Sequence, residues 1–522
     1  MTLGQIESAR CELQRTIDAS KTIDARRMLG QFSTPGELAR VIVRETRRYL
    51  EVGKELTMLE PSMGTGSFVS AGFRVLPRTL KKVLAYELDD DFYGAARNLW
   101  RECPCEIIHG DFTKIEPSRV ADVVFANPPY VRHHAIPLTD KQRLQDDVAR
   151  RVNVRVSGLA GLYCHFLLLS LEWMKPGAVG AWLIPSEWMS VNYGRAIREF
   201  FTARVELLRI HRFDAEDVRF SDALVSSCVV WFRNSVPSGR KVQFTFGTNM
   251  AKPARKKDCS IDDLRGALKW PPDEALKDDA EGLRIGDCFE IRRGIATGDN
   301  GFFVLGEESV REKGIPRRYL KPILPSPRHL KVDHVRADEE GVPTNAERRF
   351  LLDCTGRDIE ELPLSVRTYL ESGISTTATR NLCASRNVWY SQEQREPAPF
   401  LCSYMGRGGE GSAPVRFILN DSRAIATNSF LMLYPKGELA RFLERDPSCS
   451  RDVWRMLLDI SATDIVRAGR SYGGGLQKVE PKELARVPCR KISDWMSQSL
   501  SATGRMRDEP SAESLRITKG SL

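Results

Sequence analysis

The first half of the chain alternates short apolar runs with turns rich in glycine or proline. An apolar run of about four to eight residues between such turns indicates a buried strand. Stretches with apolar residues at helical spacing lie between several of these runs, and this alternation predicts an α/β fold. The predicted strands cover residues 56–59, 83–86, 106–109, 121–126, 179–185, 205–210 and 228–232, and the predicted helices include residues 140–151 and 162–174.

The second half is rich in short apolar runs and turn residues from Cys288 to about Arg490, which predicts a mixed, β-rich domain. Within it, residues 291–303 predict a strand, a glycine loop and a second strand. A basic cluster around Pro253 and the pair Pro271-Pro272 predict a linker before this domain. The predicted parts are a helical N-terminal arm (1–30), an α/β domain (31–235), a linker (236–285), a β-rich domain (286–490) and a polar tail (491–522).

Composition narrows the class of protein. A length of 522 residues fits two or three domains, and 42% hydrophobic with 28% charged residues is typical of a soluble protein. The net charge of +9 favours a polyanionic partner. The twelve cysteines lack paired C-x-x-C spacing, so we expect reduced thiols and no metal site. We find no export or membrane-spanning segment in the sequence and expect a cytoplasmic protein.

The predicted strand 121–126 stops at Asn127-Pro128-Pro129-Tyr130. Two prolines cannot continue a strand ladder, so an amide, a rigid carbonyl and an aromatic ring meet where open α/β sheets bind ligands. The Asn127 side-chain oxygen and the Pro128 carbonyl can accept the two hydrogens of an exocyclic amine and localise its lone pair, while Tyr130 can stack on the ring. The same residues also fit a plain turn after a core strand.

A glycine turn follows the first predicted strand. Glu60 and Pro61 lead into Gly64 and Gly66, and a helix begins directly after them. Glycines allow a ligand to approach the backbone closely, and a helix N-terminus favours negative charge. Glu87 ends the second strand about twenty residues later, where an acid binds ribose in doubly wound folds.

The third predicted strand ends in Asp111 and Phe112. Asp111 can accept a hydrogen bond from an adenine amino group, and Phe112 can cover the ring. Together with the glycine turn and Glu87, these residues predict a nucleoside-binding crevice across the sheet.

Two positions keep alternative interpretations. Thr34, before Pro35, fits the N-cap of a helix through residues 38–43, and this turn is either a helix start alone or part of a ligand site. Phe220 lies in a polar loop before the strand 228–232 and is either a core contact or an aromatic of the site.

Loops of the second half carry cations and aromatic rings. Arg292 and Arg293 precede a glycine-laced loop, and Tyr472 and Lys478 flank three glycines. Loops of this kind on a β scaffold can contact phosphates and base edges of DNA.

The combination of Thr34-Pro35, Glu60-Pro-x-x-Gly64-x-Gly66, Glu87, Asp111-Phe112 and Asn127-Pro-Pro-Tyr130 resembles the DNA adenine-N6 methyltransferases of bacterial restriction–modification systems. The order, with the cofactor turn first, the tetrad second and a long C-terminal region last, is similar to their gamma arrangement. The resemblance covers about residues 30–235. Beyond this it rests on residues 292–299 and 472–481, which resemble pieces of target-recognition domains, and the arm lies outside it.

The resemblance implies a Rossmann-like S-adenosyl-L-methionine-dependent methyltransferase domain over residues 31–235 and a target-recognition domain over residues 286–490. It implies methyl transfer to the N6 amine of an adenine flipped out of double-stranded DNA, without a metal. The implied cofactor-binding residues are Thr34, Glu60, Pro61, Gly64, Gly66, Glu87, Asp111, Phe112 and Pro129. The implied catalytic residues are Asn127, Pro128 and Tyr130, and the implied DNA contacts are Tyr130, Phe220, Arg292, Arg293, Tyr472 and Lys478.

We also expect a monomer in the bacterial cytoplasm, associated with the nucleoid through DNA and without membrane contact. Any restriction endonuclease or defence-system subunit would be a separate chain, since the arm is too short to hold a nuclease. An RNA or protein-glutamine methyltransferase, and a catalytically silent DNA-specificity protein, remain as alternatives. The long region after residue 236 favours DNA, and the intact tetrad favours an enzyme.

Overall fold

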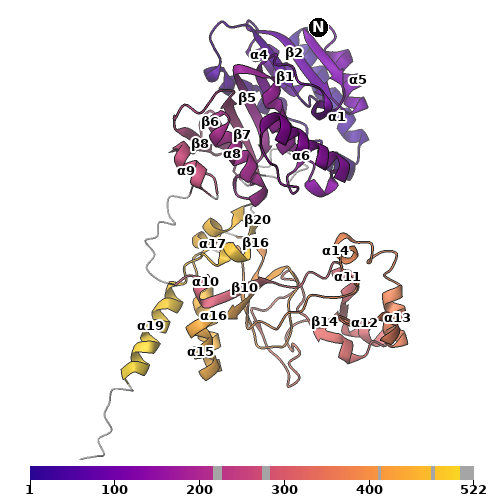
Figure 1. The fold of residues 1–522 in the computed structure, drawn as a ribbon, viewed down its shortest axis with the longest axis vertical. Helices are drawn as coiled ribbons and strands as arrows, with labels where there is room; N and C mark the ends of the chain where they lie inside the picture. The colour runs from indigo at the N-terminus through magenta and orange to yellow at the C-terminus, as the bar shows by residue number, and fades with distance from the viewer. Residues whose placement is uncertain (215–225, 268, 273–282, 409–412, 472–475, 506–522) are drawn as a thin grey trace, which may run out of the picture. The chain divides into compact units, whose positions relative to one another are not determined.

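The computed structural model describes residues 1–214, 226–267, 269–272, 283–408, 413–471 and 476–505. Contacts divide the chain into two compact units, the first within residues 1–274 and the second within residues 275–522. Each unit has its own hydrophobic core, and Figure 1 labels the elements of both. Within the described residues, no helix combines the length and the apolar composition needed to cross a membrane.

Among the described residues, nine strands form the central sheet of the first unit, in the order β3-β2-β1-β4-β5-β7-β6-β8-β9. Neighbours from β3 to β5 run parallel, whereas β7 runs antiparallel to β5 and β6. The strand order reverses between β1 and β4, and such switch points form the ligand crevice of doubly wound folds. The strands are β1 (Leu56–Glu60), β2 (Leu80–Glu87), β3 (Cys105–His109), β4 (Ala121–Ala126), β5 (Met174–Pro185), β6 (Glu206–Arg212), β7 (Ser227–Arg233), β8 (Val242–Phe246) and β9 (Arg255–Cys259).

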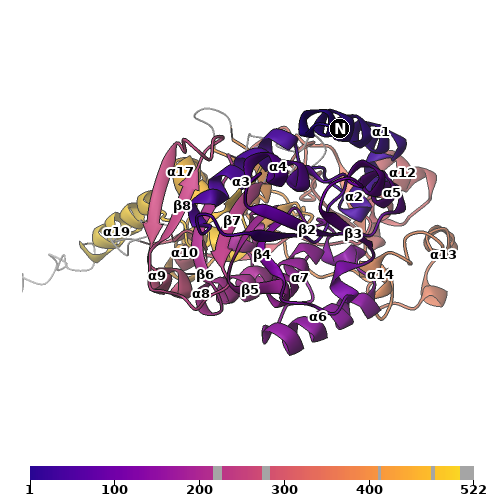
Figure 2. The same ribbon diagram turned by 90° about the horizontal axis from the view of Figure 1, so that it is seen from above.

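Helices cover both faces of this sheet. Helices α1, α3, α4 and α5 lie on one face, and α6, α7 and α8 lie on the other (Figure 2). Strand β4 is therefore buried along its whole length, which explains its nearly continuous apolar sequence. The helices are α1 (Leu3–Ser20), α2 (Ile23–Leu29), α3 (Gly36–Thr46), α4 (Ser67–Val75), α5 (Asp90–Leu99), α6 (Leu138–Val152), α7 (Leu162–Leu169), α8 (Arg195–Ala203) and α9 (Ile261–Gly266).

The predicted linker is wrong for much of residues 236–285. Strands β8 and β9 lie in this segment and extend the central sheet, with β8 parallel to β6 and β9 antiparallel to β8. Val242 and Phe244 alternate inward and are fully buried. The basic residues Arg255, Lys256 and Lys257 belong to the edge strand β9, where charged side chains discourage pairing with another sheet.

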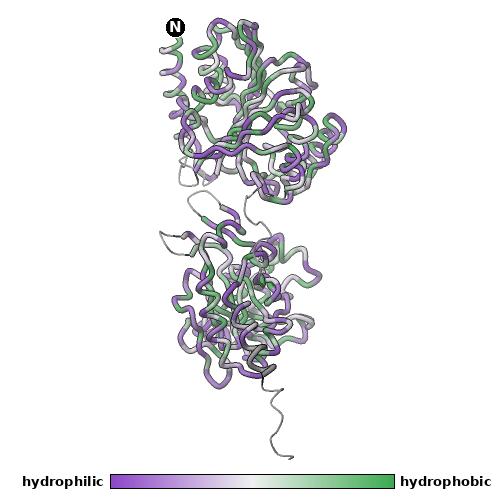
Figure 3. The backbone as a smooth tube through the Cα atoms, turned by 90° about the vertical axis from the view of Figure 1, so that its left-hand side faces the viewer, coloured by the Kyte–Doolittle hydropathy of each residue, from purple (hydrophilic) through white to green (hydrophobic). Residues whose placement is uncertain are grey.

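The second unit is a mixed β-rich body, so the predicted α/β domain followed by a β-rich domain is confirmed. Its sheets have the orders β10-β18-β15-β17-β13, β11-β14-β12 and β16-β20-β19. Hydrophobic stretches along the backbone tube of Figure 3 alternate with hydrophilic ones in both units. The strands are β10 (Phe289–Arg293), β11 (Val304–Gly306), β12 (Leu320–Pro322), β13 (His334–Val335), β14 (Arg349–Leu352), β15 (Phe400–Ser403), β16 (Met405–Arg407), β17 (Phe417–Asn420), β18 (Phe430–Pro435), β19 (Arg470–Ser471) and β20 (Leu476–Lys478).

Short helices connect these strands, and one of them replaces a predicted strand. Residues Asn300–Phe303 form helix α11 because the Asp299 side chain accepts the backbone N–H groups of Gly301 and Phe302. The helices are α10 (Ile285–Cys288), α11 (Asn300–Phe303), α12 (Glu307–Glu312), α13 (Leu364–Glu371), α14 (Asn381–Ala384), α15 (Gly437–Arg445), α16 (Ser450–Leu458), α17 (Ala462–Ala468), α18 (Pro481–Leu484) and α19 (Arg490–Arg505).

The two ends of the second unit lie side by side. The Ile285 N–H donates to the Val487 carbonyl at 2.9 Å, and the sulfur atoms of Cys288 and Cys489 are 3.8 Å apart. Ile492 and Met496 of α19 are buried in the core of this unit. The predicted polar tail from residue 491 is therefore wrong for its first part, while residues 506–522 lie outside the described residues.

Candidate active site

A cavity of about 550 Å³ lies at the carboxyl ends of β1, β2, β3 and β4. Each of these strands is followed by, or ends in, a polar residue that faces the cavity: Glu60, Glu87, Asp111 and Asn127. The predicted residues Thr34, Pro61, Gly64, Phe112 and Pro129 also line it, whereas Gly66 does not.

The glycine turn between β1 and α4 needs its two glycines. Gly64 and Gly66 have φ angles of 56° and 90°, a region that other residues rarely adopt. A Cβ atom on Gly66 would lie 2.7 Å from Nε1 of Trp100. The turn therefore brings bare backbone to the wall of the cavity.

Glu60 is a buried acid at the base of this turn. Its side chain is 2% exposed, and burial raises its pKa well above the usual value, although N–H groups of Val69 and Phe68 partly offset this. Oε2 of Glu60 has no hydrogen-bond partner among the described residues. An unpartnered buried carboxylate oxygen beside a cavity is suited to a cationic ligand group.

Glu87 joins the end of β2 to the glycine turn. Its Oε2 accepts the backbone N–H of Gly64 at 2.8 Å, and its Oε1 accepts those of Leu88 and Asp89 at 2.9 Å. Burial raises the pKa of Glu87, while the N–H groups of Asp89 and Gly64 lower it in part. The carboxylate is thus fixed in place at the cavity wall.

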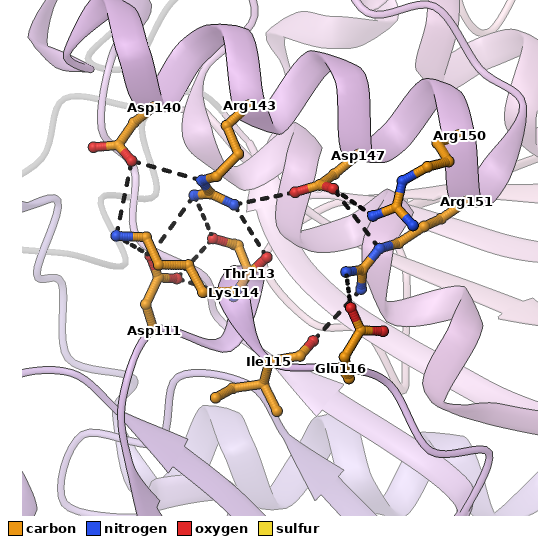
Figure 4. A network of polar contacts seen from close by, with 10 residues as sticks. All are labelled: Asp111, Thr113, Lys114, Ile115, Glu116, Asp140, Arg143, Asp147, Arg150 and Arg151. Carbon is orange, nitrogen blue, oxygen red and sulfur yellow. Dashed lines mark hydrogen bonds and ion pairs between the residues drawn. The ribbon is translucent and has the colours of Figure 1, made fainter.

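Asp111 and its neighbours are held by helix α6 on the far face of the sheet. Oδ1 of Asp111 accepts the N–H and the hydroxyl of Thr113 at 2.9 and 2.7 Å. Arg143 of α6 donates to the Thr113 carbonyl and hydroxyl at 3.2 and 3.1 Å, and Asp147 accepts from Arg143 at 3.3 Å (Figure 4). This network fixes the orientation of the Asp111 carboxylate.

Phe112 forms an aromatic wall of the cavity. It is 2% exposed, and its ring lies 5.4–5.6 Å, centroid to centroid, from the rings of Tyr86, Phe166 and Trp173. Such packing leaves one preferred position for the ring.

The Asn127 amide is oriented by two acceptors. Nδ2 donates to the Phe32 carbonyl at 2.7 Å and to Oγ1 of Thr34 at 3.0 Å. Since a carbonyl cannot donate, the nitrogen must face Phe32, and Oδ1 points away from it. Oδ1 is buried and has no partner among the described residues, although Asn127 lines the cavity.

Thr34 does not cap a helix. Helix α3 begins after Pro35 and has no side-chain cap, so the prediction of an N-cap at Thr34 is wrong. Its hydroxyl instead accepts a hydrogen bond from Asn127, and its carbonyl accepts one from Ser67 at 2.8 Å. The turn before α3 thus connects the glycine turn to the amide.

The other members of the tetrad are buried. Pro128 is buried, and Tyr130 is 8% exposed with its hydroxyl donating to the Leu183 carbonyl at 3.1 Å. Burial raises the pKa of Tyr130 well above its usual value, so the phenol stays neutral.

Several cavity residues were missed by the sequence analysis. Gln14, Gly30 and Gln31 come from the N-terminal arm, and Arg143 and Phe166 come from α6 and α7. Gly30 directly precedes the Gln31-Phe32-Ser33-Thr34-Pro35 turn, and a glycine at this point was the available signal. Arg143 and Phe166 belong to ordinary helical patterns, which gave no signal.

The predicted DNA contacts of the second unit divide into two places. Arg293 and Lys478 both lie over the ring of Tyr404, at 4.1 and 4.8 Å from its centroid. Arg292 instead pairs with Glu290 at 2.6 Å. The predictions for Phe220 and Tyr472 fall outside the described residues.

Two family models match the chain. The Eco57I restriction-modification methylase model matches residues 105–219, and the model of the C-terminal domain of the type II methyltransferase M.Eco57I matches residues 274–517. The first match includes the tetrad, and the second covers nearly all of the second unit.

Whole-length relatives agree with these models. The chain is 28% identical over 467 residues to the type II methyltransferase M.XamI of Xanthomonas campestris pv. amaranthicola, which covers 85% of this chain and 83% of the relative. It is 24% identical to M.AccI of Acinetobacter calcoaceticus over 90% of this chain and 87% of the relative. Among solved structures, a DrdV–DNA complex matches with a TM-score of 0.53 and 14% identity, over 95% of this chain and 59% of the DrdV chain. This structural likeness concerns the fold.

S-adenosyl-L-methionine carries an ammonium group, ribose hydroxyls and an adenine ring, and the residues at the cavity fit these groups. The unpartnered Oε2 of Glu60, the fixed carboxylates of Glu87 and Asp111 and the wall of Phe112 offer matching partners. The chain therefore belongs to the M.Eco57I-type restriction–modification methyltransferases in the gamma arrangement, and S-adenosyl-L-methionine is its cofactor.

Proposed function

We propose that the chain transfers a methyl group to the N6 amine of an adenine that has been flipped out of double-stranded DNA. It would act as the modification enzyme of a restriction–modification or related defence system. The observation that carries this proposal is the fixed Asn127 amide with its buried, unpartnered Oδ1 at the cavity.

A buried acceptor without a partner costs about 1–3 kcal/mol. An arriving amine would satisfy Oδ1 of Asn127 with one hydrogen, and the Pro128 carbonyl would accept the other. Both bonds draw the nitrogen lone pair out of conjugation with the purine, so that it can attack. The two prolines hold this geometry because their φ angles are fixed.

The cofactor supplies an electrophilic methyl group, and the protein supplies its position. Glu60 would bind the ammonium group, Glu87 the ribose hydroxyls, and Asp111 with Phe112 the adenine of the cofactor. Thr34, Pro61, Gly64, Gly66 and Pro129 would shape the remaining walls. Catalysis then comes from alignment of the amine and from hydrogen bonds that strengthen as positive charge develops on its nitrogen.

The amine of a paired adenine is held within the duplex, so the nucleotide must leave the stack at a cost of a few kcal/mol. Tyr130, and Phe220 outside the described residues, would stack on the flipped base and return roughly 1–3 kcal/mol each. Arg292, Arg293, Tyr472 and Lys478 would bind the duplex through the second unit.

The test is to incubate the full chain with tritiated cofactor and, separately, with duplex DNA, RNA and a glutamine-containing protein. We expect label in DNA alone, recovered as N6-methyladenine by mass spectrometry. Asn127→Ala should lower transfer by about a thousandfold or more, as loss of an active-site electrostatic donor does, while cofactor binding stays.

Asn249→Ala is the matched control, because this amide is exposed and bonds only to the local backbone. Label in RNA or protein, or in another base, would contradict the proposal. Equal transfer by Asn127→Ala and Asn249→Ala would contradict the role of the amide.

A further inference from the structure

The N-terminal arm, residues 1–31, touches the active site at separate places. Gln14 of α1 accepts a hydrogen bond from the Thr65 hydroxyl of the glycine turn at 2.7 Å. Lys21 and Gln31 both bond to Asp89, beside the Glu87 carboxylate, with the Gln31 amide at 2.8 Å. The arm therefore spans both turns that flank the cofactor cavity.

A third contact joins the arm to the catalytic tetrad. The N–H of Tyr130 donates to the Gly30 carbonyl at 3.1 Å. Gly30 has a φ of 65°, and a Cβ atom there would lie 2.4 Å from the Tyr130 nitrogen. The backbone of the arm is thus packed directly on the backbone of the tetrad.

Arg10 of α1 is a buried cation within these contacts. It is 2% exposed, and Glu7 binds its guanidinium with two hydrogen bonds of 2.7 and 2.8 Å. Burial pushes the pKa of Glu7 upward, but hydrogen bonds from Arg10 and Ser70 outweigh this and lower it to about 2. The pair is therefore ionised although it is largely buried.

The remaining donor of Arg10 points to the glycine turn. Nη1 donates to Oγ of Ser67 at 2.9 Å and to Oγ1 of Thr65 at 3.3 Å. Ser67 in turn donates to the Thr34 carbonyl at 2.8 Å, and the Thr34 hydroxyl accepts from Asn127 at 3.0 Å. A continuous series of hydrogen bonds therefore runs from Arg10 to the amide of the tetrad.

Arg10 also acts on Glu60 through its charge. The Arg10 cation favours the ionised form of the buried Glu60 carboxylate. Packing of α1 alone would not require such a group, because an apolar side chain fills a buried site without the desolvation penalty of a charge. Ile6 and Ile17 already supply apolar contacts of this helix.

We propose that residues 1–31 are a working part of the methyl-transfer site and that Arg10 is a positioning residue, which holds the glycine turn for the cofactor and, through Ser67 and Thr34, the Asn127 amide. This rests on the proposed function only for the effect on Asn127. Binding of the cofactor to the glycine turn tests the arm independently.

The test compares Arg10→Met, Arg10→Lys and Arg15→Met in the full chain. Arg15 is exposed on the same helix and donates only to the Cys11 carbonyl, so it is the matched control. We expect Arg10→Met to weaken S-adenosyl-L-methionine binding in calorimetry about tenfold and to lower kcat at saturating cofactor by about a hundredfold, as misplacement of reacting groups does.

Arg10→Lys keeps the charge but not the bidentate geometry, so it should restore most of the cofactor affinity and little of kcat. Ser67→Ala should lower kcat in the same direction by a smaller factor, and its effect should not add to that of Arg10→Met. If Arg10→Met does not fold, Ser67→Ala and Arg10→Lys decide the question.

Folded Arg10 variants that match Arg15→Met in both cofactor affinity and kcat would overturn the proposal, as would a fully active Ser67→Ala variant. A loss of thermal stability with unchanged kinetics would overturn it as well, because it indicates packing alone. If the wild-type chain transfers no methyl group to DNA, the proposed function fails, while the cofactor affinities of the Arg10 variants still support or overturn the role of the arm.

Discussion

In the first unit, groups at the cavity include buried polar atoms without partners, whereas in the second unit the cations proposed to meet DNA are already paired. Oε2 of Glu60 and Oδ1 of Asn127 illustrate the first state. Lys478 pairs with Glu480 at 3.1 Å, and Arg292 with Glu290, which illustrates the second.

The energies of the two states differ. A buried unsatisfied group costs about 1–3 kcal/mol until its ligand arrives, while an exposed ion pair is worth about 0–1 kcal/mol and is easily exchanged for a phosphate. Chemistry in this protein therefore rests on fixed, buried groups, and recognition rests on groups that can change partners.

The largest effect should come from Gly30→Ala, which disturbs the fixed half. The new Cβ would collide with the Tyr130 nitrogen, so we expect kcat to fall by about a hundredfold in methyl-transfer assays. Gly53→Ala is the control, since Gly53 also has a positive φ of 78° but has nothing within 4 Å of its Cβ position. Similar kcat values for the two variants would argue against a fixed tetrad.

Glu60→Gln should have the next largest effect. Loss of a charged hydrogen bond of about 1.5–3 kcal/mol should weaken cofactor binding by roughly ten- to a hundredfold in calorimetry, whereas the exposed Glu55→Gln should not. Because burial raises the folded-state pKa of Glu60, its stabilising protonated form is lost as pH rises, so Glu60→Gln should raise the Tm at neutral pH. A lower Tm would contradict this assignment.

Arg293→Ala combined with Lys478→Met tests the exchangeable half. We expect DNA binding to weaken about tenfold at low salt, with a salt dependence reduced by about one unit of slope per phosphate contact, and cofactor affinity to stay unchanged. Lys313→Met is the control, because Lys313 lies over the ring of Tyr369 in the same unit at 5.4 Å. An equal loss in the control would indicate a general charge effect.

The smallest effect should be the pH dependence of cofactor binding. The charged or titratable groups acting on Glu60 are Arg10, Glu87 and Cys105, and burial raises the pKa values of Glu60 and Glu87. Since the ionised acids would bind the cofactor, affinity should fall a few-fold as pH drops from about 8 to about 6. Glu60→Gln should flatten this profile, and a steeper profile would refute the role of Glu60.

Most of the catalytic frame was predictable because buried strands and their terminal polar residues leave a local pattern. Glu60, Glu87, Asp111 and Asn127 each end or follow a strand, so the sheet alone brings them together. Phe32 could not be predicted as a partner of Asn127, because that contact joins residues 95 positions apart through a backbone carbonyl.

The errors have the same origin in tertiary contacts. The basic residues of β9 resemble a solvated linker until β8 is seen beside them, and the polar sequence after residue 491 conceals the buried Ile492 and Met496. At Asn300–Phe303 the sequence is apolar enough for a strand, but the Asp299 cap starts a helix.

The hydrogen bond between Ile285 and Val487 closes the second unit into a loop whose entry and exit coincide. A body with adjacent termini tolerates circular permutation and insertion into a surface loop of another protein. Residues 283–505 thus form a transferable cassette, and specificity can be exchanged between such enzymes without rebuilding the groups that move the methyl group.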